Sequence, residues 1–165
     1  MFTIDALPAY NDNYIWVIIN QATRACAIVD PGEAPVVVEY LKKHDLTLSA
    51  ILITHHHWDH VNGIQGLLDY QQVPVYGPSK EDIPLVDHPV NDNDSIELYD
   101  IQAEFEAMEL PGHTVGQIAY YGIGRVFTGD TLFSAGCGRM FEGTPKQFAH
   151  SLERLKKLSV NTHVY

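Results

Sequence analysis

Three histidines, a tryptophan, an aspartate and a fourth histidine form the segment HHHWDH at residues 55–60, directly after the apolar run AILIT at residues 50–54. A short apolar run of this kind predicts a buried strand, so the polar cluster lies at the carboxyl end of that strand. Imidazole and carboxylate groups are common protein ligands of divalent metals. The alternative is a solvated polar loop, or a histidine-rich stretch that binds metal adventitiously. Spacing and position both favour a metal site.

The side chains of the cluster divide into two groups. In an extended segment successive side chains point to opposite faces, so His55 and His57 point together and can hold one ion, while His56 points away. Replacing His56 by alanine is therefore expected to leave the metal content nearly unchanged. Asp59 and His60 come where the chain turns towards the next helix, and they offer a carboxylate and an imidazole to a second, adjacent ion.

Two later segments, ELPGHT and FTGDT, each follow a predicted strand and each add one ligand-type side chain. His113 follows a glycine that permits a tight turn, and its imidazole would complete a set of three histidines. The two carboxylate oxygens of Asp130 could bridge two cations and lower their mutual repulsion. Taken singly, His113 could also be a turn residue, and Asp130 a turn or helix-capping aspartate.

The rest of the chain predicts a single α/β domain, because short strand patterns alternate with helical ones without repeats or a linker-like change in composition. Residues 14–20 and 25–30 predict an antiparallel hairpin that a Pro-Gly pair ends. Besides 50–54, the other predicted strands are 73–77, 103–110, 117–122 and 125–130, and the predicted helices are 33–44, about 61–71, and 145–158.

Composition excludes several classes of function. A formal net charge of −11 disfavours electrostatic binding to nucleic acid or to anionic membranes. No apolar stretch approaches the roughly 20 residues of a membrane span and the amino terminus lacks a signal-peptide pattern, so we expect a cytoplasmic location. Cys26 and Cys137 are too few for a disulfide framework and are expected to be free thiols. The sequence leaves the oligomeric state open.

The motifs THHHWDH, PGHT and TGDT, in this order, resemble the metal-binding motifs of the metallo-β-lactamase fold superfamily. NDNYIWVI at 11–18 and GDTLFSAGCGRMFEGT at 129–144 further resemble glyoxalase II, the family of hydroxyacylglutathione hydrolases. The resemblance covers essentially the whole chain and implies an α/β (α+β) fold, a four-layered αββα sandwich. It also implies two divalent metal ions, with zinc as the first choice and iron or manganese as alternatives.

The reaction that the resemblance implies is hydrolysis of the thioester of an S-(2-hydroxyacyl)glutathione, typically S-D-lactoylglutathione, to glutathione and a 2-hydroxy acid. A metal-bound hydroxide would attack the carbonyl carbon, and the thiolate would leave with little need for a general acid. The substrate partner is thus a small glutathione thioester, with no nucleic acid or membrane involved.

The resemblance assigns roles to individual residues. The ligands would be His55, His57 and His113 for the first metal, Asp59 and His60 for the second, and Asp130 between them. The chemistry of a metal-bound hydroxide gives Asp59 a catalytic role as well, in which it would accept a hydrogen bond from the hydroxide and orient it. For substrate binding, Arg139 matches a basic glutathione-contacting position and Phe141 a position that is commonly tyrosine. From the residues alone, Arg139 would be a surface cation and Phe141 a loop anchor in the core.

The chain departs from glyoxalase II at its end, SVNTHVY, where that family continues with a His-Glu-Tyr segment and a helical domain that carries further glutathione contacts. We therefore expect residues 1–165 to form the catalytic domain alone, with a weaker second metal site and impaired turnover. His163 lies before the expected ligand position, in a predicted terminal strand, and is not expected to replace the missing ligand. His44, His88 and His150 are expected at the surface.

Two other functions stay open. Persulfide dioxygenases share the fold but use one iron ion, which His55, His113 and Asp130 would hold here. A metal-binding domain without turnover is the second alternative. Metallo-β-lactamase activity fits less well, because neither cysteine lies where the second-metal thiolate of the major classes of those enzymes belongs.

Overall fold

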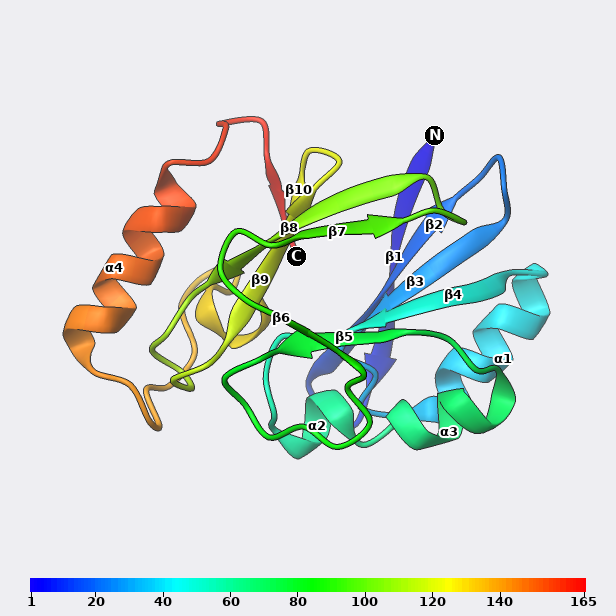
Figure 1. Cartoon of the computed structure of the whole chain (residues 1–165), viewed down its shortest axis with the longest axis horizontal. Coiled ribbons are helices and arrows are strands. Elements are labelled where there is room, and N and C mark those ends of the chain that lie inside the picture. Colours follow the sequence, from blue (N-terminus) through cyan, green and yellow to red (C-terminus); the bar gives the residue numbers. More distant parts are fainter.

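Two β-sheets packed face to face form the centre of the computed structural model, which describes residues 1–165 (Figure 1). The first sheet has the order β1-β2-β3-β4-β5-β6, with β1 (Phe2–Ala9), β2 (Asn13–Asn20), β3 (Ala25–Val29), β4 (Thr47–Leu52), β5 (Val75–Pro78) and β6 (His88–Val90). The second has the order β11-β10-β9-β8-β7, with β7 (Ser95–Leu98), β8 (Ala103–Glu109), β9 (Ile118–Gly122), β10 (Arg125–Phe127) and β11 (His163–Val164). Strands β3 to β6 run parallel, which brings their carboxyl ends to one edge.

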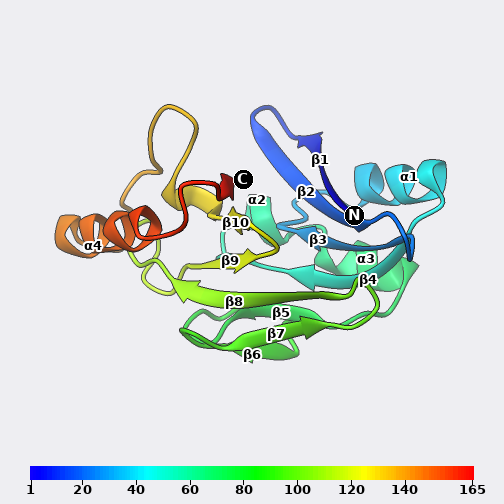
Figure 2. The same cartoon turned by 90° about the horizontal axis from the view of Figure 1, so that it is seen from above.

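Helices cover the outer faces of the two sheets, and Figure 2 shows α1 and α4 at opposite sides of the molecule. The helices are α1 (Ala34–His44), α2 (Trp58–Val61), α3 (Ile64–Tyr70) and α4 (Pro145–Lys156). Three apolar clusters fill the three interfaces between the layers: α1 and α3 against the first sheet, one sheet against the other, and α4 against the second sheet. The expected four-layered αββα sandwich is thus confirmed.

Local sequence signals account for the longer helices. Helix α1 has Pro35 in its first turn, a position where the missing N–H is no loss, and it ends at Asp45 in the left-handed conformation. Helix α4 begins with a capping box, in which Thr144 accepts a hydrogen bond from the backbone of Gln147 while the Gln147 side chain accepts one from the backbone of Thr144. These signals fix α4 close to its predicted bounds.

Several sequence-based bounds were wrong. The helix predicted at about 61–71 begins later, as α3 at Ile64, and the short helix α2 before it was not predicted. The two are divided where the backbone N–H of Gly63 donates to the carbonyl of Pro31 at 2.7 Å. A Cβ atom at position 63 would overlap that carbonyl oxygen, so the divided conformation depends on glycine. The strand predicted at 125–130 ends at Phe127, where the chain turns into a 3-10 turn at Gly129–Thr131.

Strands β1, β6 and β7 were not predicted. Strand β1 contains Asp5 and Pro8 and shows no clean alternation of buried and exposed residues, which is tolerated because it lies at an edge of the first sheet. Strands β6 and β7 are only three and four residues long, too short for a periodic signal. Cys26 and Cys137 are both free, as expected, the first buried and the second exposed. None of the helices has the length and apolar character that crossing a membrane requires.

Candidate metal centre

The predicted ligand residues all lie in segments that follow strands. His55 and His57 lie in the loop after β4, and Asp59 and His60 lie in the short helix α2 that continues it. His113 follows β8, and Asp130 lies in the 3-10 turn after β10. Strand β4 belongs to the first sheet and strands β8 and β10 to the second, so the loops meet where the two sheets adjoin. Residues up to 75 positions apart in the sequence thereby converge on one place.

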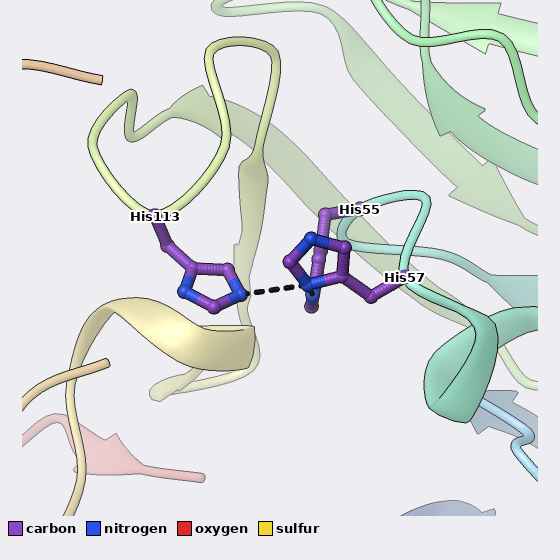
Figure 3. Close-up of side chains that lie close together, drawn as sticks. All are labelled: His55, His57 and His113. Carbon is purple, nitrogen blue, oxygen red and sulfur yellow. Dashed lines mark hydrogen bonds between the residues drawn. The ribbon is translucent and has the colours of Figure 1, made fainter. Parts of the chain in front are cut away.

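Three histidines form the first group, drawn in Figure 3. Nδ1 of His57 lies 3.2 Å from Nε2 of His55 and 2.9 Å from Nε2 of His113. The alternation of side chains along the extended segment therefore brings His55 and His57 together, as the sequence predicts. His56 lies on the other side of the loop, where its Nδ1 is 2.9 Å from a carboxylate oxygen of Glu81.

Hydrogen bonds orient two of these rings towards the site. The hydroxyl of Thr54 donates its one hydrogen to Asp30 at 2.6 Å. Nδ1 of His55 lies 3.0 Å from the same hydroxyl oxygen and must therefore be the donor in that contact. In the same way Nδ1 of His113 donates to the backbone carbonyl of Arg139 at 2.7 Å. In their neutral forms both rings then present the unprotonated Nε2 to the centre of the group.

A second group adjoins the first. His60 is held at Nδ1 by Asp30 at 3.0 Å, and its Nε2 lies 3.5 Å from Asp59 and 3.3 Å from Asp130. The other carboxylate oxygen of Asp130 lies 3.4 Å from Nε2 of His113. Asp130 therefore faces both groups at once, one oxygen to each, which is the arrangement that a bridging ligand needs.

The surroundings shift the pKa values of His55 and His57 and that of His60 in opposite directions. Burial lowers the pKa of His55 well below its usual value, and the neighbouring histidines lower it further; burial likewise lowers the pKa of His57. Burial would also lower the pKa of His60, but its hydrogen bonds to Asp130 and Asp30 outweigh that effect and raise the pKa to about 10. The same contact with His60 outweighs burial and lowers the pKa of Asp130.

The donor set fits divalent cations. Three imidazole nitrogens lie within 4.8 Å of one another, and two of them present lone pairs to the same space. Lone pairs converging in a buried place repel one another unless a cation or a proton lies between them. Imidazole nitrogen with carboxylate oxygen is a donor set that suits zinc, iron and manganese better than magnesium or calcium.

Two residues that orient the candidate ligands were missed from the sequence. Asp30 is buried and accepts hydrogen bonds from both the backbone and the hydroxyl of Thr54 besides its contact with His60. Asn13 donates from its side chain to Oδ2 of Asp59 at 2.7 Å. The signal for Asp30 was its place after the apolar run ACAIV, at the same edge of parallel strands as the histidine cluster. No local signal marks Asn13.

An open cavity of about 1150 Å³ lies beside the candidate ligands and is lined by Arg139 and Phe141 among others. The ring of Phe141 is exposed rather than part of the core, and its centre lies 5.6 Å from that of His57 and 5.3 Å from that of His113. The expectation of a core anchor was therefore wrong for Phe141. Aromatic side chains from β2, Tyr14 and Trp16, also line the cavity.

The remaining histidines lie outside the centre. His44, His88 and His150 are exposed, in agreement with the sequence-based expectation. His163 is exposed in β11, paired with Arg125, and it does not line the cavity.

The family model described as "Metallo-beta-lactamase superfamily" matches residues 11–164. A protein of Vibrio cholerae named hydroxyacylglutathione hydrolase is 52% identical over 166 residues, which cover 100% of this chain and 65% of that protein. The chain thus spans 65% of the length of this relative.

Two solved structures are also similar. The structure of BLEG-1, a B3 metallo-beta-lactamase, aligns with a TM-score of 0.88 and 26% identity over 98% of this chain and 90% of that one. That of ETHE1 from Myxococcus xanthus aligns with a TM-score of 0.87 and 32% identity over 99% of this chain and 74% of that one.

Proposed function

The chain belongs to the metallo-beta-lactamase superfamily, and from that premise we propose that its metal centre hydrolyses the thioester of S-(2-hydroxyacyl)glutathiones, with S-D-lactoylglutathione as the typical substrate. The observation that carries the proposal is the joining of two ligand groups through Asp130, beside a cavity lined by Arg139. The name of the Vibrio cholerae relative, 52% identical over the whole chain, supports the choice of substrate.

Zinc is the proposed metal, with iron or manganese as alternatives. The first ion would be held by His55, His57 and His113, the second by Asp59 and His60, and Asp130 would be shared. When bound, two adjacent divalent cations lower the pKa of water towards neutrality and polarise a carbonyl group.

The side chains themselves have distinct tasks. Asn13 occupies Oδ2 of Asp59, which leaves the other oxygen free to accept a hydrogen bond from the attacking water and to orient it. Arg139 offers its guanidinium to a carboxylate of glutathione. Phe141 packs an apolar face beside the acyl group, since it lacks the hydroxyl of a tyrosine. No side chain has to protonate the leaving group, because a thiolate with a pKa of about 8.5 departs readily near neutral pH.

The test is metal content per chain measured together with S-D-lactoylglutathione hydrolysis in the presence of added zinc. We expect hydrolysis above the buffer rate that a chelator abolishes. Asp59→Asn should lower it by about 100-fold or more, as expected for loss of a group that orients the attacking water. The matched control Asp100→Asn removes an exposed carboxylate and should leave the rate unchanged. Zinc binding without any hydrolysis would contradict the proposal.

The competing function, a persulfide dioxygenase with one iron ion, uses only His55, His113 and Asp130. That function assigns no role to His57, Asp59 or His60, although all three side chains lie in the same site. Oxygen consumption with one iron ion per chain, and no thioester hydrolysis, would favour that function instead.

A further inference from the structure

Glu81 carries a carboxylate that is almost completely buried, with 2% of its side chain exposed. It lies in the loop after β5, outside the cavity and outside the candidate ligand set. A carboxylate removed from water is costly to the fold unless donors satisfy its oxygens. Its presence here therefore calls for an explanation in terms of the groups that it contacts.

Those groups belong to the two loops that carry the three histidines. One oxygen of Glu81 accepts a hydrogen bond from the backbone N–H of His56 at 2.6 Å and lies 2.9 Å from Nδ1 of the same residue. The other oxygen accepts a short hydrogen bond from the hydroxyl of Thr114. In the sequence, His56 stands between the candidate ligands His55 and His57, and Thr114 directly follows the candidate ligand His113.

The two loops come from different sheets, the first from β4 and the second from the connection between β8 and β9. At their bases one backbone hydrogen bond joins them, from the N–H of Ile118 to the carbonyl of Thr54 at 3.0 Å. Nearer the histidines, side-chain contacts such as those of Glu81 set their separation. The separation determines the gap between His57 and His113, whose nearest nitrogens are 2.9 Å apart. Gly116 also lies so close to Glu81 that a Cβ atom there would overlap its side chain.

We infer that Glu81 is a positioning residue for the three-histidine site: its buried carboxylate holds the two ligand loops at the separation that one metal ion requires. The inference rests on the proposed metal centre but not on the proposed substrate. It also gives His56 a task without making it a ligand. The backbone N–H of His56 supplies one of the bonds, so most of the connection survives loss of its side chain.

A graded set of variants follows from these contacts. Glu81→Gln keeps the size of the side chain but turns one acceptor oxygen into a donor, so it should lower zinc affinity at the first site by about 10- to 100-fold, as is typical for partners that orient ligands. Thr114→Val removes one bond and should have a smaller effect. His56→Ala should have the smallest effect, since it keeps the backbone donor. Asp82→Asn, at an exposed neighbouring carboxylate, is the matched control and should not change the affinity.

The experiment is competition of the folded protein with a chromophoric chelator for zinc, together with urea unfolding of the metal-free chain. In the Glu81→Gln background, Thr114→Val should lower zinc affinity less than it does in the original chain, because the two residues share a bond. Glu81→Gln with zinc affinity within about threefold of the original would overturn the inference, whatever its effect on unfolding. An original chain that binds no zinc would overturn the inference and the metal centre together.

Discussion

Raising the pH should tighten the second metal site much more than the first. His60 is buried, which by itself would lower its pKa, but its hydrogen bonds to Asp130 and Asp30 raise the pKa to about 10. A metal ion that binds Nε2 of His60 must therefore displace a proton at neutral pH. Burial lowers the pKa of His55 and of His57, so their imidazole rings can bind a metal ion without first losing a proton.

The size of the effect follows from the pKa of His60. In the empty centre, a proton held with a pKa of about 10 opposes metal binding at pH 7 by about three powers of ten, or roughly 4 kcal/mol, and an ion already held by Asp130 reduces that opposition. As long as the pH is below that pKa, affinity at the second site should rise about tenfold for each unit by which the pH increases. Above that pKa the affinity should level off. The second site also has only one imidazole against three in the first, so it should be the weaker site at every pH up to that value.

The assay is calorimetric titration of the metal-free chain with zinc at pH 7.0 and pH 8.0, each in two buffers with different enthalpies of ionisation. We expect a tight first ion and a weaker second one, whose dissociation constant falls about tenfold between the two conditions. The second ion should release about one proton, which the comparison of buffers counts. His60→Gln, which removes the titrating group, should abolish the pH dependence. Two equally tight sites, or a second site indifferent to pH, would refute the reasoning.

Three further predictions concern single side chains. At saturating zinc, His57→Ala should lose the first ion while His56→Ala keeps it, as measured by metal analysis after gel filtration; equal losses would contradict the alternation of side chains. Arg139→Ala should raise KM for S-D-lactoylglutathione at least tenfold with a smaller change in kcat, whereas equal changes in the two would argue against a role in binding. Arg154 in α4 donates to the Asp92 carboxylate and to a backbone carbonyl of β8. Arg154→Ala should therefore lower the free energy of unfolding, measured by urea titration, by about 1–3 kcal/mol. The exposed control Lys156→Ala should leave it almost unchanged.

The candidate ligands could be predicted from the sequence because each follows an apolar run. A strand points its carboxyl end at an edge of the sheet, and alternation along the extended chain then separates His55 and His57 from His56. The fold class followed from the same runs together with the helical pattern of α1 and α4. The short strands β6 and β7 could not be predicted, because three or four residues do not establish a period.

The orienting residues other than Asp30 are a different case, because no property of their own sequence context marks them. Glu81 stands in an ordinary polar loop, PSKEDIP, and only the fold brings its carboxylate to His56 and Thr114. The group that holds His113 cannot be predicted from residue type at all, since it is the backbone carbonyl of Arg139, which any residue would supply.

That backbone contact joins the two halves of the proposed function. The loop that carries Arg139 and Phe141 into the cavity also fixes His113, through the Arg139 carbonyl and through the N–H of Phe141, which donates to the His113 carbonyl at 3.1 Å. Gly138 allows this approach, because a Cβ atom there would overlap the carbonyl oxygen of Asp130 and crowd the ring of His113. A change in the loop backbone should therefore alter both the proposed substrate contacts and the proposed metal ligation, whereas truncation of the Arg139 side chain should leave the candidate ligands in place.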